Sequence, residues 1–74
     1  MLSFEIVQSG PANLIQICCD DAGLTTLLEA LKRLGHHGHV HLLSPSNGGH
    51  ELAEATPFGK PAIQEVIITD VGGE

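Results

Sequence analysis

The alternation of apolar and polar positions predicts two strands at the start of the chain. Residues 2–8, LSFEIVQ, place every second side chain from Leu2 onward on one apolar face. Residues 14–19, LIQICC, alternate in the same way from Ile15 onward. The link between them contains a Gly-Pro pair and is short, and a short link joins antiparallel neighbours. The first 19 residues are therefore expected to form a β-hairpin.

The period then changes from two residues to between three and four, which predicts a helix over residues 21–34. Asp20 or Asp21 can cap its start by accepting hydrogen bonds from free backbone amides. Gly35 provides the stop. The apolar positions form one stripe that we expect to face a sheet, made of Leu24, Leu27, Leu28, Leu31 and Leu34.

Two further strands are predicted in the second half of the chain, at residues 39–44 and 62–70. The connection between them, residues 45–61, is rich in glycine and proline. The order ββαββ predicts an α+β, two-layer domain spanning residues 1–74, with one helix packed on a four-stranded, mainly antiparallel sheet.

The sheet face turned away from the helix would be more apolar than a fully solvated face requires. Such a face can support partner docking or a homodimer through the open sheet. The residues expected on it are Val7, Leu14, Cys18, His39, His41, Leu43 and Ile67.

Length and composition limit the functional classes. A chain of 74 residues has room for a single small core. The sequence has no apolar run of 18 residues and no basic leader at its N-terminus, so we expect neither a membrane span nor a signal peptide. Cys18 and Cys19 are adjacent and would point to opposite faces of a strand, so a cytoplasmic, reduced protein is expected.

The charge balance is acidic, with nine Asp and Glu residues against three Lys and Arg residues and a net charge of −6. Phosphate would be repelled by such a surface, and only Phe4 and Phe58 could stack on bases, so nucleic-acid binding is not expected. Acidity favours a basic partner through long-range attraction, although it can also serve solubility alone.

All five histidines lie between residues 36 and 50. His39 and His41 are two positions apart on a predicted strand and so project from the same face. Together with His50 they could ligate zinc, which usually takes three or four protein ligands. The alternative, which we prefer, is that the imidazoles are polar, half-exposed surface groups and that no metal is bound, because nothing in the sequence fixes His50.

Catalytic patterns are weaker still. Ser44 or Ser46 with a histidine lacks a recognisable orienting carboxylate, and Asp20 and Asp21 lie next to the cysteines where a reactive thiolate needs positive charge. The Gly48–Gly49 pair lacks the lysine of a phosphate-binding loop. A domain of this size also offers little volume for a substrate pocket. We therefore expect no enzyme activity and no cofactor.

Residues 39–54, HVHLLSPSNGGHELAE, resemble the signature segment of the immunity protein 32 family of bacterial polymorphic toxin systems. The matching pattern is a strand written H-x-H-L, a small polar stretch, a glycine pair and an acidic-Leu pair. A hydrophobic strand follows, and the likeness covers residues 39–69. This sequence has Asn47 where the family often has an aromatic residue. The matching residues are His39, His41, Leu42, Gly48, Gly49, Glu51 and Leu52.

The resemblance implies a small cytosolic protein that binds and neutralises a cognate toxin domain, which is often basic, and that has no catalytic activity of its own. On this interpretation the histidines are contacts rather than ligands, and Glu51 and Glu54 are exposed carboxylates that meet the toxin. The expected partner-binding residues are His39, His41, Asn47, Gly48, Gly49, His50, Glu51 and Glu54.

Overall fold

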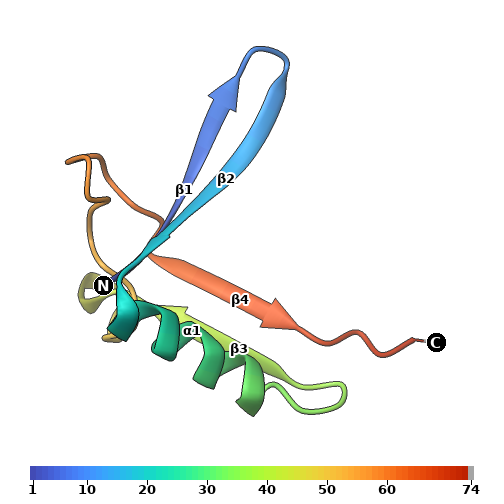
Figure 1. Cartoon of the computed structure of the whole chain (residues 1–74). Helices are drawn as coiled ribbons and strands as arrows, with labels where there is room; N and C mark the ends of the chain where they lie inside the picture. The colour runs from blue at the N-terminus through green and yellow to red at the C-terminus, as the bar shows by residue number, and fades with distance from the viewer. Residues whose placement is uncertain (74) are drawn as a thin grey trace.

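The computed structural model describes residues 1–73, so Glu74 of the predicted domain 1–74 lies outside the described residues. The elements follow the predicted order, with one short 3-10 turn added between the last two strands (Figure 1). They are β1 (Leu2–Ser9), β2 (Ala12–Cys19), α1 (Asp21–Arg33), β3 (His39–Leu43), η1 (Pro45–Asn47) and β4 (Glu65–Thr69).

The first hairpin confirms the two predicted N-terminal strands. β1 and β2 pair antiparallel over their full length, from Leu2 opposite Cys19 to Ser9 opposite Ala12. At the base of the hairpin Leu2 and Phe4 are buried in the core. Further along, the same apolar face runs past the core into solvent, and Ile15 is 64% exposed. The hairpin therefore projects from the rest of the molecule (Figure 1).

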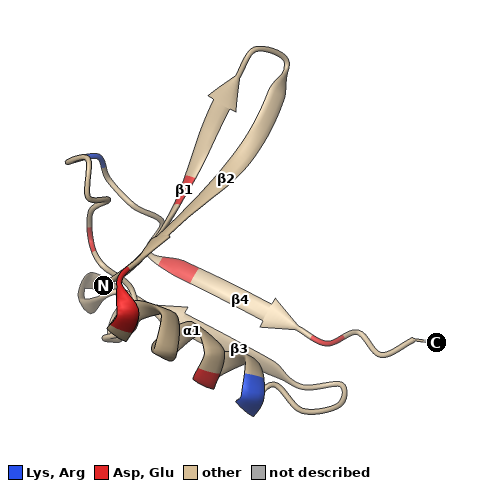
Figure 2. Ribbon diagram, viewed as in Figure 1, with Lys and Arg blue, Asp and Glu red and all other residues tan. Residues whose placement is uncertain are grey.

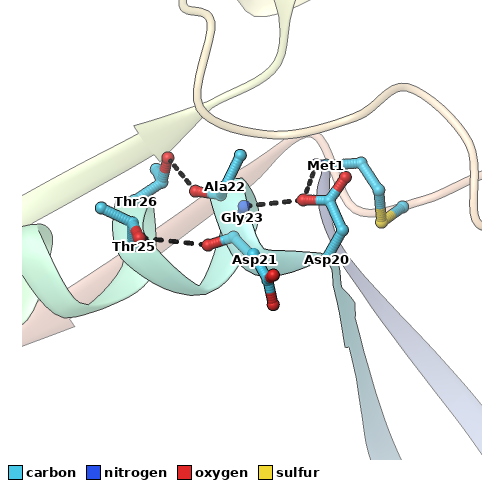
Figure 3. A network of polar contacts seen from close by, with 7 residues as sticks. All are labelled: Met1, Asp20, Asp21, Ala22, Gly23, Thr25 and Thr26. Atoms are coloured by element: carbon cyan, nitrogen blue, oxygen red, sulfur yellow. Dashed lines mark hydrogen bonds and ion pairs between the residues drawn. The ribbon is translucent and has the colours of Figure 1, made fainter.

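The start of α1 is fixed by Asp20, as the capping prediction requires (Figure 3). The Asp20 Oδ1 atom accepts hydrogen bonds from the backbone N–H of Gly23 at 2.8 Å and from the N-terminal ammonium of Met1 at 2.5 Å. The first bond satisfies an amide that has no partner within the helix. The second ties the helix start to the beginning of β1.

The leucine stripe of α1 was predicted to face the sheet, and this is wrong for three of its five members. Leu24, Leu28 and Leu31 are each close to half exposed. Only Leu27 and Leu34 pack against the core, together with the fully buried Ala30. The strands that α1 contacts, β1, β2 and β3, belong to two separate sheets and do not form one broad surface, so the helix buries a narrower stripe than a four-stranded sheet would cover.

β3 and β4 form the second hairpin, and α1 packs against β1 and β2 of the first hairpin as well as against β3. β3 pairs antiparallel with β4, with Val40 opposite Ile68 and Leu42 opposite Val66. These four side chains belong to the core or pack against it, and Leu42 is fully buried. Alternation along the strands then turns the neighbouring positions outward.

The predicted four-stranded sheet is wrong, because the strands form two separate two-stranded sheets. The outer edge of β1 is occupied at its base by the connection between β3 and β4. Ala53 N–H donates to the Leu2 carbonyl and Ile63 N–H donates to the Phe4 carbonyl, each at 2.8 Å. Past Ile63 the chain turns away as β4, so the two hairpins diverge (Figure 1).

Candidate functional site

The outer surface of the second hairpin carries the histidine pair that was predicted from the sequence. His39 and His41 are exposed, and their rings meet edge to face with centroids 5.1 Å apart. The register places His41 opposite Ile67 and His39 opposite Thr69. We call the surface formed by His39, His41, Glu65, Ile67 and Thr69 the histidine face.

Glu65 joins the histidine face to the connection that follows β3. Its Oε2 atom lies 2.9 Å from Nδ1 of His41, and its Oε1 atom lies 3.5 Å from Nδ2 of Asn47. An ionised carboxylate only accepts hydrogen bonds, so the His41 ring presents an N–H at Nδ1. One side chain therefore orients both the imidazole and the Asn47 amide.

Two carboxylates hold the connection in one conformation. Glu51 Oε1 accepts from the backbone N–H of Leu43 at 3.0 Å. Glu54 accepts from the backbone N–H of Ser46 at 2.6 Å and from its hydroxyl at 2.8 Å. The backbone adds bonds from the N–H groups of Glu51 and Leu52 to the Leu43 carbonyl. The connection is therefore a folded element and not a loose link between strands.

The same contacts lower the pKa of each carboxyl group. The backbone N–H of Leu43 is the largest influence that lowers the pKa of Glu51 from its ordinary value of 4.5. The Ser46 hydroxyl, followed by the Ser46 backbone N–H, lowers the pKa of Glu54 from 4.5. A hydrogen bond to the charged form favours that form. Both groups are therefore structural anions at neutral pH.

Glu51 was expected to be exposed, and this is wrong. Its side chain is only 19% exposed and turns inward onto the strand that precedes it. Glu54 is exposed, as expected, but both of its oxygens are engaged by Ser46.

The backbone of the connection requires glycine at both Gly48 and Gly49. Gly48 has φ of +88° and closes the 3-10 turn in the left-handed conformation that glycine adopts without strain. Gly49 passes so close to β3 that a Cβ atom there would lie 2.3 Å from Cβ of Leu43. The pair lets the connection fold back over Leu43 and brings Asn47 to the histidine face.

His50 does not join the other histidines. Its side chain is 91% exposed, and its Nε2 atom lies 3.7 Å from Oε2 of Glu51. Among residues 1–73 no group of three or more His, Cys, Asp or Glu side chains is arranged to hold a metal ion. The alternative zinc set of His39, His41 and His50 is thus not brought together.

Glu65 is the site residue that sequence reasoning missed. Its place on the outward side of a strand follows from the alternation in EVIIT, where Val66 and Ile68 are the core positions. Its partners depend on the β3–β4 register, which is a long-range property. No pocket opens within the described residues, and the histidine face is a surface and not a cleft.

Comparison of the chain with protein-family models, with curated proteins and with solved structures found no match. The resemblance of residues 39–69 to the immunity protein 32 family therefore stays a prediction. No helix within residues 1–73 is long and apolar enough to cross a membrane.

Proposed function

We propose that this protein is an immunity-type binding protein that neutralises a cognate toxin domain through the histidine face and the adjoining turn at Asn47–His50. The observation that carries the proposal is the way in which Glu51 and Glu54 fix this turn from within. A recognition loop that is already ordered loses little conformational entropy on binding. The segment held in this way is the one that resembles the immunity family.

The charge of the chain supports a basic partner. The net charge of −6 attracts a cationic domain over distances of about a Debye length, roughly 8 Å at physiological salt. At the proposed surface Glu65 supplies a carboxylate that is 40% exposed, and His41 and Asn47 contact it with hydrogen-bonding groups. His39 lies beyond His41 on the same face. Because the attraction acts mainly before contact, added salt should slow association more than it speeds dissociation.

The absence of a pocket in the described residues fits this mode of action, because a flat polar surface with an ordered loop can cover an active site on another protein. On this proposal Glu51 and Glu54 act as positioning residues. They hold the surface and do not touch the toxin.

The proposal is tested by co-expression in bacteria with the C-terminal domain of a toxin encoded beside this protein. Survival of the cells and co-purification of the two chains are the expected results. The matched control is co-expression with an unrelated toxin domain of similar charge, which should still kill. Equal killing by the cognate toxin with and without this protein, with no co-purification, would show that the proposal is wrong.

A further inference from the structure

The first hairpin leaves a complete row of backbone groups without a partner along β2. The Phe4 carbonyl points away from β2 to accept from Ile63, so Phe4 and Ile17 form a non-hydrogen-bonded pair. By alternation the N–H and C=O groups of Asn13, Ile15, Ile17 and Cys19 all point outward from β2. Within residues 1–73 none of them makes a backbone hydrogen bond to another element.

The hairpin is also an apolar projection. Ile6, Ile15 and Ile17 lie on one face and are 65%, 64% and 49% exposed. An isolated two-stranded hairpin with such a face is marginally stable in water. Long apolar strand edges are normally paired, covered or charged.

The molecule exposes more surface, and is more extended, than a compact chain of the same size. The exposed area is 4953 Å², whereas a compact chain of 7.8 kDa exposes about 4,400 Å². The radius of gyration is 13.2 Å, against about 11 Å for a compact domain of this length. A stable dimer buries roughly 800 Å² on each partner, so the excess surface is a large part of what one interface needs.

The distribution of charge indicates which kind of partner can pair with the edge of β2. No charged side chain occurs from residue 6 to residue 19, and the outer part of the hairpin carries no red or blue (Figure 2). A basic partner finds no carboxylate there. A second copy of a chain with net charge −6 would be repelled over most of its surface, and the uncharged edge of β2 is where two copies can meet with the least repulsion. The nearest charge in the hairpin is Glu5, which pairs with Gln16 and lies one strand away from that edge.

We propose that two copies of this chain pair through their β2 edges to form a four-stranded antiparallel sheet with its twofold axis at Gln16. In this register Ile15 lies opposite Ile17 of the second copy, and Asn13 lies opposite Cys19 of the second copy. All four outward-facing residues of each strand are then paired. A shift by two residues in either direction leaves one of them unpaired or sets it opposite Pro11, which has no N–H.

The pairing is isologous, since the same edge is used by both copies. It makes the isoleucine face continuous across the axis, and aliphatic cross-strand pairs stabilise such a junction. The histidine face belongs to the other hairpin and stays free, so each dimer would present two copies of the proposed toxin-binding surface.

The proposal is tested on the purified protein alone, so its failure is separate from any failure to bind a toxin. Sedimentation equilibrium at about 10–100 µM should show a dimer. The Ile15→Lys, Ile17→Lys double variant should raise the dimer dissociation constant at least about tenfold, because lysines protect an edge from pairing. The matched control, Ile67→Lys on β4, should leave the dimer unchanged.

A cross-link tests the register and does not depend on how the lysine variants fold. In a Cys18→Ser, Cys19→Ser background, Gln16→Cys should form a disulfide between copies when a thiol oxidant is added, because facing residues on the axis lie within disulfide range. Gln8→Cys, the control on β1, should not. A monomer throughout the concentration range, a dimer that survives both lysines, or equal cross-linking at the two positions would overturn the proposal.

Discussion

The Glu54 carboxylate and Ser46 are joined by two hydrogen bonds, at 2.6 Å to the Ser46 backbone N–H and at 2.8 Å to its hydroxyl. The two residues are eight positions apart and close the turn that contains Asn47, Gly48, Gly49 and His50. The contact turns a glycine-rich segment into a defined surface beside β3. Much of the proposed function depends on this closure.

Replacement of Glu54 by glutamine should loosen the turn without unfolding the protein. The two Ser46 donors use separate oxygens of the carboxylate, whereas an amide has one accepting oxygen and no charge to strengthen the bonds. We expect faster amide hydrogen exchange at residues 46–50 and unchanged exchange in the core strands. Glu29→Gln, on the exposed side of α1, is the control. Equal exchange in the two variants would mean that Glu54 does not hold the turn.

Stability should fall on acidification below about pH 4.5. The pKa of Asp20 is lowered from its ordinary value of 3.8, first by the N-terminal ammonium, and the pKa values of Glu51 and Glu54 are lowered from 4.5. The unfolded chain therefore takes up protons at these groups before the folded one does. Their stabilising contribution is complete above pH 4.5 and is lost as the pH falls through the folded-state pKa values.

Urea denaturation at a series of pH values measures this effect. The midpoint should be nearly the same at pH 7 and pH 5.5 and should fall steadily below pH 4.5. The Glu51→Gln, Glu54→Gln variant should show a shallower fall, because two of the three groups are removed. A midpoint that rises on acidification would contradict the assignment.

Two buried serines should respond in opposite directions to the loss of their hydroxyl groups. Ser3 is 1% exposed, and among the described residues its Oγ atom has no hydrogen-bond partner. Ser44 is equally buried, but its Oγ atom lies 3.2 Å from Oγ of Ser46. Ser3→Ala should raise the free energy of unfolding by about 1 kcal/mol, whereas Ser44→Ala should lower it by about 1 kcal/mol. Matching signs in denaturation experiments would count against this account of the core.

Truncation of a leucine side chain to alanine should destabilise the protein far less on α1 than on β3. Leu28 is 47% exposed on α1, and Leu42 is fully buried on β3. Leu42→Ala should cost about 2–5 kcal/mol of unfolding free energy, and Leu28→Ala less than about 1 kcal/mol in the monomer. The sequence pattern places Leu28 on the stripe expected to face the sheet, where truncation would be equally costly. A loss above 2 kcal/mol for Leu28→Ala would restore that expectation.

Local signals predicted the elements well, and long-range pairing was harder. The alternation from Leu2 and the Asp20 cap each act within a few residues, and both are confirmed by the structure. The single sheet failed because Ala53 and Ile63, within or beside a segment expected to be loop, occupy the edge of β1. No pattern in the sequence specifies which edge a loop residue will meet.

In the candidate site, too, the features set by local sequence were predicted and those set by long-range contacts were not. The shared face of His39 and His41 follows from a spacing of two on a strand and was predicted. The roles of Glu51 and Glu65 were not predicted. Nothing near Glu51 in the sequence indicates that it will accept a hydrogen bond from the preceding strand, and nothing near Glu65 indicates that it will contact His41 on the neighbouring strand. The sequence alone does not distinguish a carboxylate that accepts hydrogen bonds within its own turn from one that contacts a partner protein.

The most direct test of the central claim is the affinity of the cognate toxin domain for two charge-reversal variants, measured by calorimetry. Glu65→Lys changes the histidine face, and Glu29→Lys makes the same change in charge on α1, where the side chain is 55% exposed. We predict that Glu65→Lys weakens binding at least about tenfold and that Glu29→Lys changes it less than about threefold. Equal effects of the two variants, or a loss confined to Glu29→Lys, would contradict the account.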